Sequence, residues 1–204
     1  IDGAEAAKNT LAIAKVSDEL GFKRIWFSEH HGLQILQGGS PEILIGAVGA
    51  QTKKIRVGSG GIMMANHSAY HVAENFRMLE ALYPGRIDLG VGRAGGGDRF
   101  IQSLFRGDPE GFEWQVNMLS LFFHDGVDGA RAYPSVPTSP DMWLLSTGGS
   151  AESGKLAAEK GMGLALALFI NPNASPDAVH YYRDNFIPSR EFPEPKVIIA
   201  INCI

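Results

Sequence analysis

Residues 54–98 read KIRVGSGGIMMANHSAYHVAENFRMLEALYPGRIDLGVGRAGGGD, and this stretch decides the fold. An apolar strand is expected at 55–59, a helix at 69–82 and a second apolar strand at 87–91. The helix should stop at Tyr83-Pro84-Gly85, because proline cannot continue a helix and glycine suits a helix end. A strand, a helix and a second strand in this order are typical of a parallel α/β sheet.

The same alternation continues on both sides of this stretch. Before it, helices are expected at 2–20 and 40–52, with a strand at 24–28 between them. After it, the expected elements are a helix at 112–123, a strand at 142–145, a helix at 151–160, a strand at 163–169, a helix at 175–186 and a strand at 197–204. The helix at 112–123 is expected to bury Trp114, and the segments 95–108 and 125–140 are expected to be irregular.

The six expected strands fit either a doubly wound sheet or a barrel. A (β/α)8 TIM barrel has eight strands in about 250 residues. The chain opens on a helix and closes on a strand, which is the pattern of such a barrel without its first strand and its last helix and strand. No linker or low-complexity segment divides the sequence, so residues 1–204 are predicted to form a single, partial barrel domain.

The composition argues against several classes of function. The chain has 204 residues, of which 45% are hydrophobic and 20% charged, with a formal net charge of −4, as is ordinary for a globular domain. The sequence has no basic block that would indicate nucleic-acid binding, and no run of about 18 apolar residues that would span a membrane. The single cysteine, Cys203, excludes an intramolecular disulfide, and together with the absence of a secretion signal it predicts a cytoplasmic protein.

Polar, glycine-rich residues follow the ends of the expected strands, where parallel sheets bind their ligands. In the loop at 146–153, Gly149-Ser150 leads into a helix whose free N–H groups suit a phosphate. The hydroxyl of Ser153 and the guanidinium of Arg93 can add hydrogen-bond donors to the same anion. The alternative is that Ser150 simply caps the helix.

The sequence Glu29-His30-His31 follows the strand at 24–28. Adjacent histidines on an extended chain point to opposite sides, so they rarely bind one metal ion, and no metal site is predicted here. Two interpretations stay open: a buried histidine bonded to Glu29 or to the backbone, or a histidine acting as an acid, a base or a polar wall of a ligand pocket. The glycines Gly60-Gly61 either admit a flat ligand or ease a bend in the strand.

The stretches RIWFSEHHG (24–32), 54–98 and MWLLSTGGSAESGKLAAEKG (142–161) resemble the bacterial luciferase-like flavin monooxygenases, in particular their single-component branch. The resemblance implies a (β/α)8 barrel that binds reduced FMN, or the deazaflavin F420 in some branches, at the C-terminal ends of the strands. It implies that reduced FMN and O2 oxidise a small organic substrate. The family's first strand, and its last helix and strand, would lie outside the residues 1–204.

The resemblance also implies roles for individual residues. His30 corresponds to the catalytic histidine beside the flavin ring. Gly60-Gly61 corresponds to a non-proline cis peptide packed against that ring, and Asn66 lines the flavin pocket. The remaining residues correspond to the phosphate site of the cofactor, and they are Arg93, Gly149, Ser150 and Ser153.

Three alternative functions stay open at this point. They are an F420-dependent dehydrogenase on the same barrel, a flavin-binding protein without turnover, and a metal-independent hydrolase that uses His30 and Glu29. Besides substrate and O2, a flavin reductase is a candidate partner, and neither nucleic acid nor membrane is expected to bind. A homodimer is expected from the family, and the candidate contacts, for which burial in the core is the alternative, are Ile43, Ile45, Met78 and Leu79.

Overall fold

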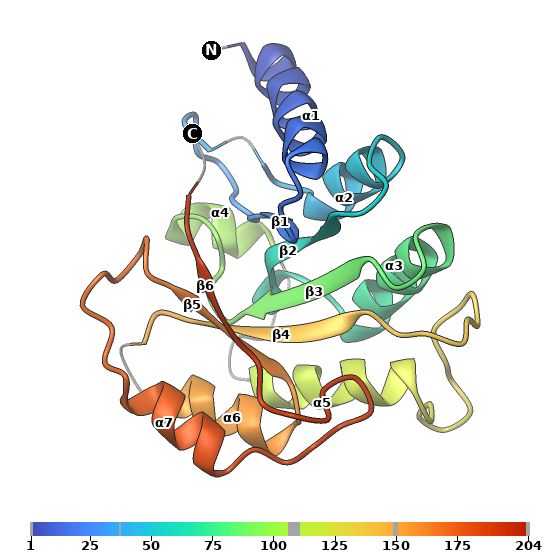
Figure 1. Cartoon of the computed structure of the whole chain (residues 1–204), viewed down its shortest axis with the longest axis vertical. Coiled ribbons are helices and arrows are strands. Elements are labelled where there is room, and N and C mark those ends of the chain that lie inside the picture. Colours follow the sequence, from blue (N-terminus) through green and yellow to red (C-terminus); the bar gives the residue numbers. More distant parts are fainter. Residues whose placement is uncertain (1, 37, 106–110, 149–150, 203–204) are drawn as a thin grey trace. The chain divides into compact units, whose positions relative to one another are not determined.

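The computed structural model describes residues 2–36, 38–105, 111–148 and 151–202, in which six parallel strands alternate with helices (Figure 1). The elements in chain order are α1 (Gly3–Glu19), β1 (Arg24–Phe27), α2 (Pro41–Gly49), β2 (Arg56–Met63), the 3-10 helix η1 (Met64–Asn66), α3 (Ala69–Leu82), β3 (Ile87–Gly92), α4 (Arg99–Leu104), α5 (Phe112–Phe123), β4 (Asp141–Ser146), α6 (Glu152–Glu159), β5 (Gly163–Ala167), α7 (Asp177–Asp184) and β6 (Val197–Ala200). The chain divides into two compact units, of which the first comprises 1–89 and 93–140 and the second 90–92 and 141–204.

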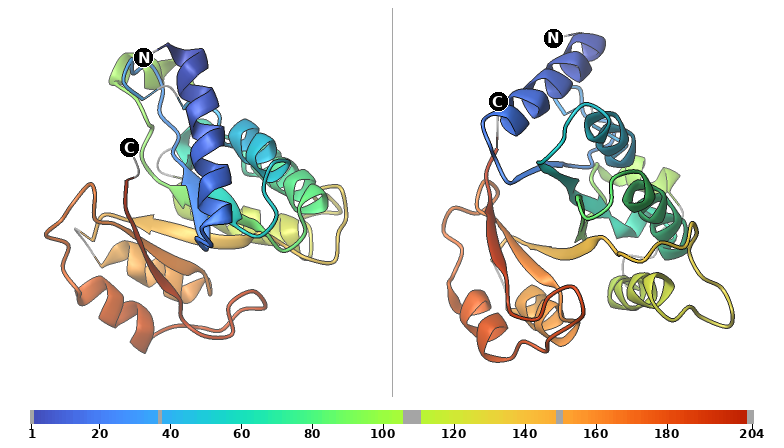
Figure 2. Two further views of the ribbon diagram at one scale, coloured as in Figure 1. Left: turned by 45° about the horizontal axis from the view of Figure 1, so that its top comes forward. Right: turned by 45° about the vertical axis from the view of Figure 1, so that its right-hand side comes forward.

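The first unit contains the sheet order β1-β2-β3. β1 pairs with β2 in parallel, with Arg24 opposite Arg56 and Phe27 opposite Ser59. Helices α2 and α3 lie side by side in this unit, as both views of Figure 2 show. Apolar side chains from the strands and helices form its core, and the fully buried ones include Ile45, Val57, Val72, Phe76 and Leu89.

The second unit contains the end of β3 followed by β4, β5 and β6. Trp143 of β4 lies opposite Gly163 of β5, and a Cβ atom at Gly163 would come within 2.3 Å of the indole ring. Glycine is therefore required where the indole crosses β5. All five residues of β5 are buried, as is usual for a parallel strand that is covered on both faces.

A buried carboxylate on β3 links the first three strands of the first unit. Asp88 of β3 is 0% exposed and accepts hydrogen bonds from Arg24 Nε at 3.0 Å, Trp26 Nε1 at 2.9 Å and Arg56 Nε at 2.7 Å. Both arginines also form ion pairs with it. These partners come from β1 and β2, so Asp88 joins three neighbouring strands at one point.

Most of the predicted elements are confirmed. The helix at 69–82 is α3 to the residue, and six strands occur where six were expected. The segment 95–108 was expected to be irregular, and this prediction is wrong because it contains α4, whose first turn is capped by Asp98 through a bond to Ile101 N. Trp114 was expected to be buried but is 62% exposed.

Two of the candidate dimer contacts are corrected by the structure. Ile45 and Leu79 are 0% and 6% exposed, because both side chains face the core of the first unit and so cannot bind a second subunit. Ile43 and Met78 are 72% and 51% exposed. The (β/α)8 barrel with segments outside residues 1–204 stays a prediction.

Candidate functional site

The loop that follows β1 carries polar side chains that contact one another in pairs. Residues 28–31 follow β1 outside any helix or strand, and their side chains contact one another two residues apart, Ser28 with His30 and Glu29 with His31. His30 Nδ1 lies 3.1 Å from the Ser28 hydroxyl, and His31 Nε2 lies 2.6 Å from Glu29 Oε1.

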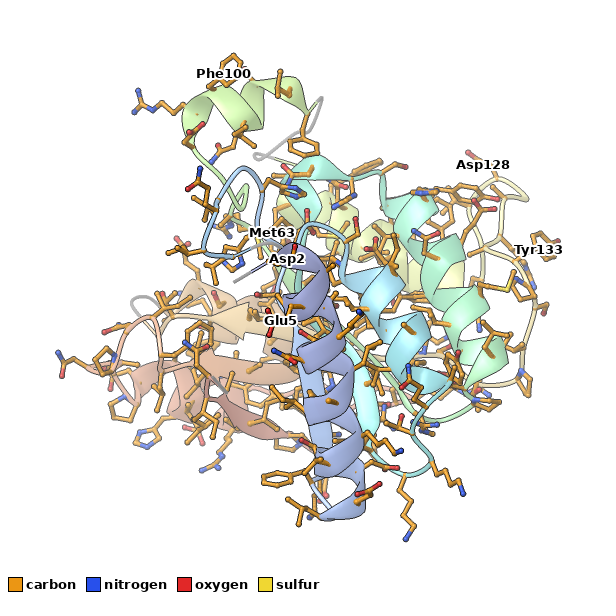
Figure 3. The ribbon with its side chains drawn as sticks, turned by 90° about the horizontal axis from the view of Figure 1, so that it is seen from above. Asp2, Glu5, Met63, Phe100, Asp128 and Tyr133 are labelled. Carbon is orange, nitrogen blue, oxygen red and sulfur yellow. The ribbon has the colours of Figure 1, made fainter. Side chains whose placement is uncertain are left out.

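Glu29 is the centre of the site. Its side chain is 0% exposed, and its carboxylate accepts four hydrogen bonds. Oε1 accepts from His31 Nε2 at 2.6 Å, His67 Nε2 at 2.8 Å and Asn66 Nδ2 at 3.2 Å. Oε2 accepts from the backbone N–H of Met63 at 2.8 Å, and Met63 is labelled in Figure 3. A buried carboxylate with this many donors is stabilised in its ionised form.

The pKa values of Glu29 and His67 are shifted in opposite directions. Burial alone would raise the pKa of Glu29, but hydrogen bonds from His67, His31 and the Met63 N–H outweigh burial and lower it. Burial alone would lower the pKa of His67, but the hydrogen bond and negative charge of Glu29, with a smaller effect of Glu42, raise it. Glu29 and His67 thus each favour the charged form of the other across their 2.8 Å contact, in which the carboxylate is buried and the imidazole is partly exposed.

Hydrogen bonds to the backbone carbonyls of Gly95 and Gly96 join the three loops of this unit around Glu29. The N–H of His31 donates to the carbonyl of Gly96 at 2.8 Å, and Asn66 Nδ2 donates to the carbonyl of Gly95 at 3.0 Å. Gly96 has φ +68, and a Cβ atom there would lie 3.0 Å from the carbonyl oxygen of Glu29. Glycine is thus needed at residue 96 both for its backbone angle and for the close approach of the loops.

An open hollow of about 450 Å³ lies beside this network. It is lined by His30, His31, Gly32, Leu33, Gln34, Leu36 and Gly39. The hollow therefore combines two imidazole rings with apolar side chains.

The predicted flavin-ring contacts in this unit are positioned by β2 and η1. The Gly60–Gly61 peptide bond is cis, as the resemblance implies. Gly60 keeps partial exposure, whereas its neighbours Ser59 and Gly61 are buried. The side-chain amide of Asn66 donates hydrogen bonds to Glu29 and to the Gly95 carbonyl. Asn66 therefore joins two loops, a role that the sequence did not predict.

The predicted phosphate residues are only partly within the described structure. Arg93 is exposed directly after β3, and its guanidinium lies 5.4 Å from the centroid of the Phe112 ring. Gly149 and Ser150 lie outside the described residues. Ser153 lies in the first turn of α6, in the second unit, and the residue at the N-cap of α6 is Ala151, which makes no side-chain capping bond. Phosphate binding by these residues stays a prediction.

Sequence reasoning missed the part that His67 plays. His67 lies in the glycine-rich stretch after β2, at a strand end where ligand residues were sought, but no local pattern links it to Glu29, which is 38 residues away in sequence. Within residues 2–36, 38–105, 111–148 and 151–202, no group of three or more His, Cys, Asp or Glu side chains is placed to hold a metal ion. In the same residues, none of the helices has both the length and the apolar character needed to cross a membrane.

The chain is similar in sequence to known proteins over nearly its whole length. The model of a family described as luciferase-like monooxygenase matches residues 1–204. The uncharacterized protein YwcH of Bacillus subtilis is 43% identical over 206 aligned residues, which cover 96% of this chain and 61% of YwcH. A luciferase-like monooxygenase of Escherichia coli is 38% identical, covering 98% of this chain and 61% of that protein. An N-acetyl-S-alkylcysteine monooxygenase of Bacillus subtilis is also 38% identical, covering 82% and 53%. The chain thus spans about three fifths of the length of the first two relatives.

Solved structures show the same fold. The crystal structure of apo-MsnO8 superimposes with a TM-score of 0.90 at 35% identity, covering 98% of this chain and 61% of MsnO8. A type II Baeyer–Villiger monooxygenase, the oxygenating constituent of 3,6-diketocamphane monooxygenase from Pseudomonas putida in complex with FMN, gives 0.70 at 17% identity, covering 93% and 60%. An F420-dependent secondary alcohol dehydrogenase gives 0.66 at 16% identity, covering 88% and 61%. The last two likenesses concern the fold alone.

Proposed function

Because the chain belongs to the luciferase-like monooxygenase family, we propose that it acts as a flavin-dependent monooxygenase that oxidises a small organic substrate with reduced FMN and O2. The observation that carries this proposal is the family match over residues 1–204. Two relatives at 38% identity that bear the name monooxygenase support it. The FMN complex of the Pseudomonas putida enzyme supports the choice of FMN at the level of the fold.

The residues of the first unit fit a flavin in their chemistry. The Gly60–Gly61 peptide has no side chain on either residue, and Gly60 is partly exposed, so a flat ring can approach the backbone there. Arg93 offers an exposed guanidinium that suits a phosphate. When bound, reduced FMN would supply the electrons that activate O2.

In this proposal His30 is the catalytic residue. Its Nδ1 lies beside the Ser28 hydroxyl, which leaves Nε2 as the atom that holds or transfers a proton at the hollow. The Ser28 hydroxyl orients the ring, and the bond from the backbone N–H of His30 to the Gly38 carbonyl, at 2.8 Å, holds the backbone that carries it. The protein contributes orientation and proton transfer, and Glu29 keeps the loops around the ring in place.

The test is to supply the protein with chemically reduced FMN and isotopically labelled O2 in the presence of small apolar compounds. We expect one labelled oxygen atom in a product, and we expect His30→Ala to lower the rate far more than it weakens FMN binding. His71→Ala is the matched control, because His71 is an exposed histidine on α3. Equal losses of rate and affinity in His30→Ala would contradict the catalytic role.

A second candidate is an F420-dependent dehydrogenase, which the fold of the F420-dependent secondary alcohol dehydrogenase favours. It predicts tight binding of F420 and oxidation of an alcohol without O2. Titration of the protein with FMN and with F420, followed by absorbance, separates the two candidates.

We also propose that a separate flavin reductase supplies the reduced FMN and that the protein is a homodimer in which Ile43 and Met78 lie at the contact. Both side chains are more than half exposed on α2 and α3, which lie side by side. The dimer is tested by light scattering of wild type and Ile43→Lys, of which only the variant should be monomeric. The reductase is tested by NADH consumption, which should require the added reductase.

A further inference from the structure

We propose that His31 presents a hydrogen-bond acceptor, its Nδ1 atom, to the hollow after β1 and there selects a mostly apolar substrate that carries one O–H or N–H donor. The inference rests on the proposed function only in taking the hollow as the place of the organic substrate. It concerns a residue for which the resemblance implies no role, and it concerns binding and not the oxidation itself.

The hydrogen bond to Glu29 decides which ring nitrogen of His31 carries the proton. His31 Nε2 lies 2.6 Å from Glu29 Oε1, and an ionised carboxylate can only accept a hydrogen bond. Nε2 therefore carries the proton, and in the neutral ring Nδ1 is left as an acceptor. Because the pKa of Glu29 is lowered, its carboxylate stays ionised at neutral pH and keeps this tautomer in place.

Neighbouring residues orient the His31 ring. The His31 N–H is held by the Gly96 carbonyl at 2.8 Å, and the Phe105 ring lies with its centroid 4.6 Å from that of the imidazole. Glu29 on Nε2 and the Phe105 ring thus hold the imidazole, and the Gly96 carbonyl holds the backbone that carries it. Fixed acceptors select ligands better than mobile ones, since less conformational freedom is lost when the ligand binds.

The Nδ1 atom of His31 lies close to Gly39. A Cβ atom at Gly39 would lie 3.4 Å from Nδ1, and both residues line the hollow. The side chain of His31 keeps 15% of its exposure, and within the described parts of the chain Nδ1 has no hydrogen-bond partner. Glycine at residue 39 thus keeps a side chain from lying against Nδ1.

The walls of the hollow are partly apolar. Leu33 and Leu36 line the hollow and are 41% and 43% exposed, so apolar surface is available for a ligand to cover. Apolar walls around a few placed polar atoms are the usual composition of a small-molecule site. A ligand that fits is apolar over most of its surface and donates one hydrogen bond to His31.

The experiment uses the whole chain, labelled with ¹⁵N-histidine, and two probes of similar size, benzyl alcohol and toluene. We expect the His31 resonances to show the Nε2–H tautomer, and benzyl alcohol, but not toluene, to shift the Nδ1 signal. We expect His31→Phe to weaken benzyl alcohol binding about five- to tenfold, as for the loss of one hydrogen bond, while toluene binding is kept. Toluene binding also shows that the variant is folded.

Leu33→Ala is the matched control, because it removes apolar wall and should weaken both probes equally. The Nδ1–H tautomer, equal binding of the two probes in wild type, or no binding of either at His31 would overturn the proposal. None of these readouts uses FMN or O2, so failure here is distinguishable from failure of the proposed monooxygenase function.

Discussion

Replacing Glu29 tests the network that organises the site. In Glu29→Ala, four donors that now bind the carboxylate lose their acceptor, and the imidazole of His67 loses its buried counter-charge. Breaking a fully buried ion pair costs about 3–5 kcal/mol of folding free energy, and because the His67 side chain is 22% exposed we expect a loss at the lower end of this range. Glu29→Gln keeps the volume and one acceptor oxygen, but its NH2 group meets the Met63 N–H, and one lost hydrogen bond with a buried unpaired donor costs about 1–3 kcal/mol.

The assay is urea unfolding of wild type, both Glu29 variants and the control Glu19→Gln. Glu19 is exposed at the end of α1, so its replacement should change the free energy of unfolding by less than about 0.5 kcal/mol. The reasoning is refuted if Glu29→Ala loses no more stability than Glu19→Gln, or if Glu29→Gln is as destabilising as Glu29→Ala.

The same network predicts a pH dependence. The pKa of Glu29 is lowered from 4.5, so the stability it contributes is complete above that pH and is lost as the pH falls through the folded value. The pKa of His67 is raised from 6.5, so its contribution is complete below that pH and is lost as the pH rises through the folded value. The pair therefore stabilises the first unit most between pH 4.5 and 6.5, and in Glu29→Gln this maximum should flatten.

Two further replacements probe the frame around the site. Gly96→Ala should cost more stability than the control Gly21→Ala. Both glycines have positive φ, which costs alanine about 1–2 kcal/mol, but only at Gly96 would the Cβ crowd another atom, the Glu29 carbonyl oxygen at 3.0 Å. Equal losses of the two variants in thermal unfolding would show that the loops do not pack this closely. Asp88→Asn should cost about 3 kcal/mol or more in urea unfolding, since two arginines lose their buried partner. A loss below about 0.5 kcal/mol, as for an ordinary surface replacement, would contradict the pairing.

Much of the fold follows from local sequence signals. Helix α3 begins and ends as predicted, because Pro84 and Gly85 stop it and its apolar positions repeat at helical spacing. Helix α4 was missed, since it has only six residues and none of them is buried, so no apolar period marks it. Its Phe100, which is labelled in Figure 3, is exposed.

The site was predictable only in part for a related physical reason. The alternation of an extended chain already separates His30 from His31 and pairs His31 with Glu29. The bonds of Glu29 to His67 and Met63 depend on how β1 and β2 pair, and that register is a tertiary property. Long-range partners of this kind leave no local pattern in the sequence.

The proposed binding of FMN is tested by anaerobic titration of the protein with reduced FMN, followed by calorimetry, for wild type, Arg93→Ala and Arg93→Lys. We predict saturable binding to wild type, and a loss of about tenfold or more in Arg93→Ala, as expected when a charge-assisted hydrogen bond to phosphate is removed. Arg93→Lys should lose less, because it keeps the charge but not the planar fork. No saturable binding to wild type, or unchanged affinity in Arg93→Ala, would contradict the account.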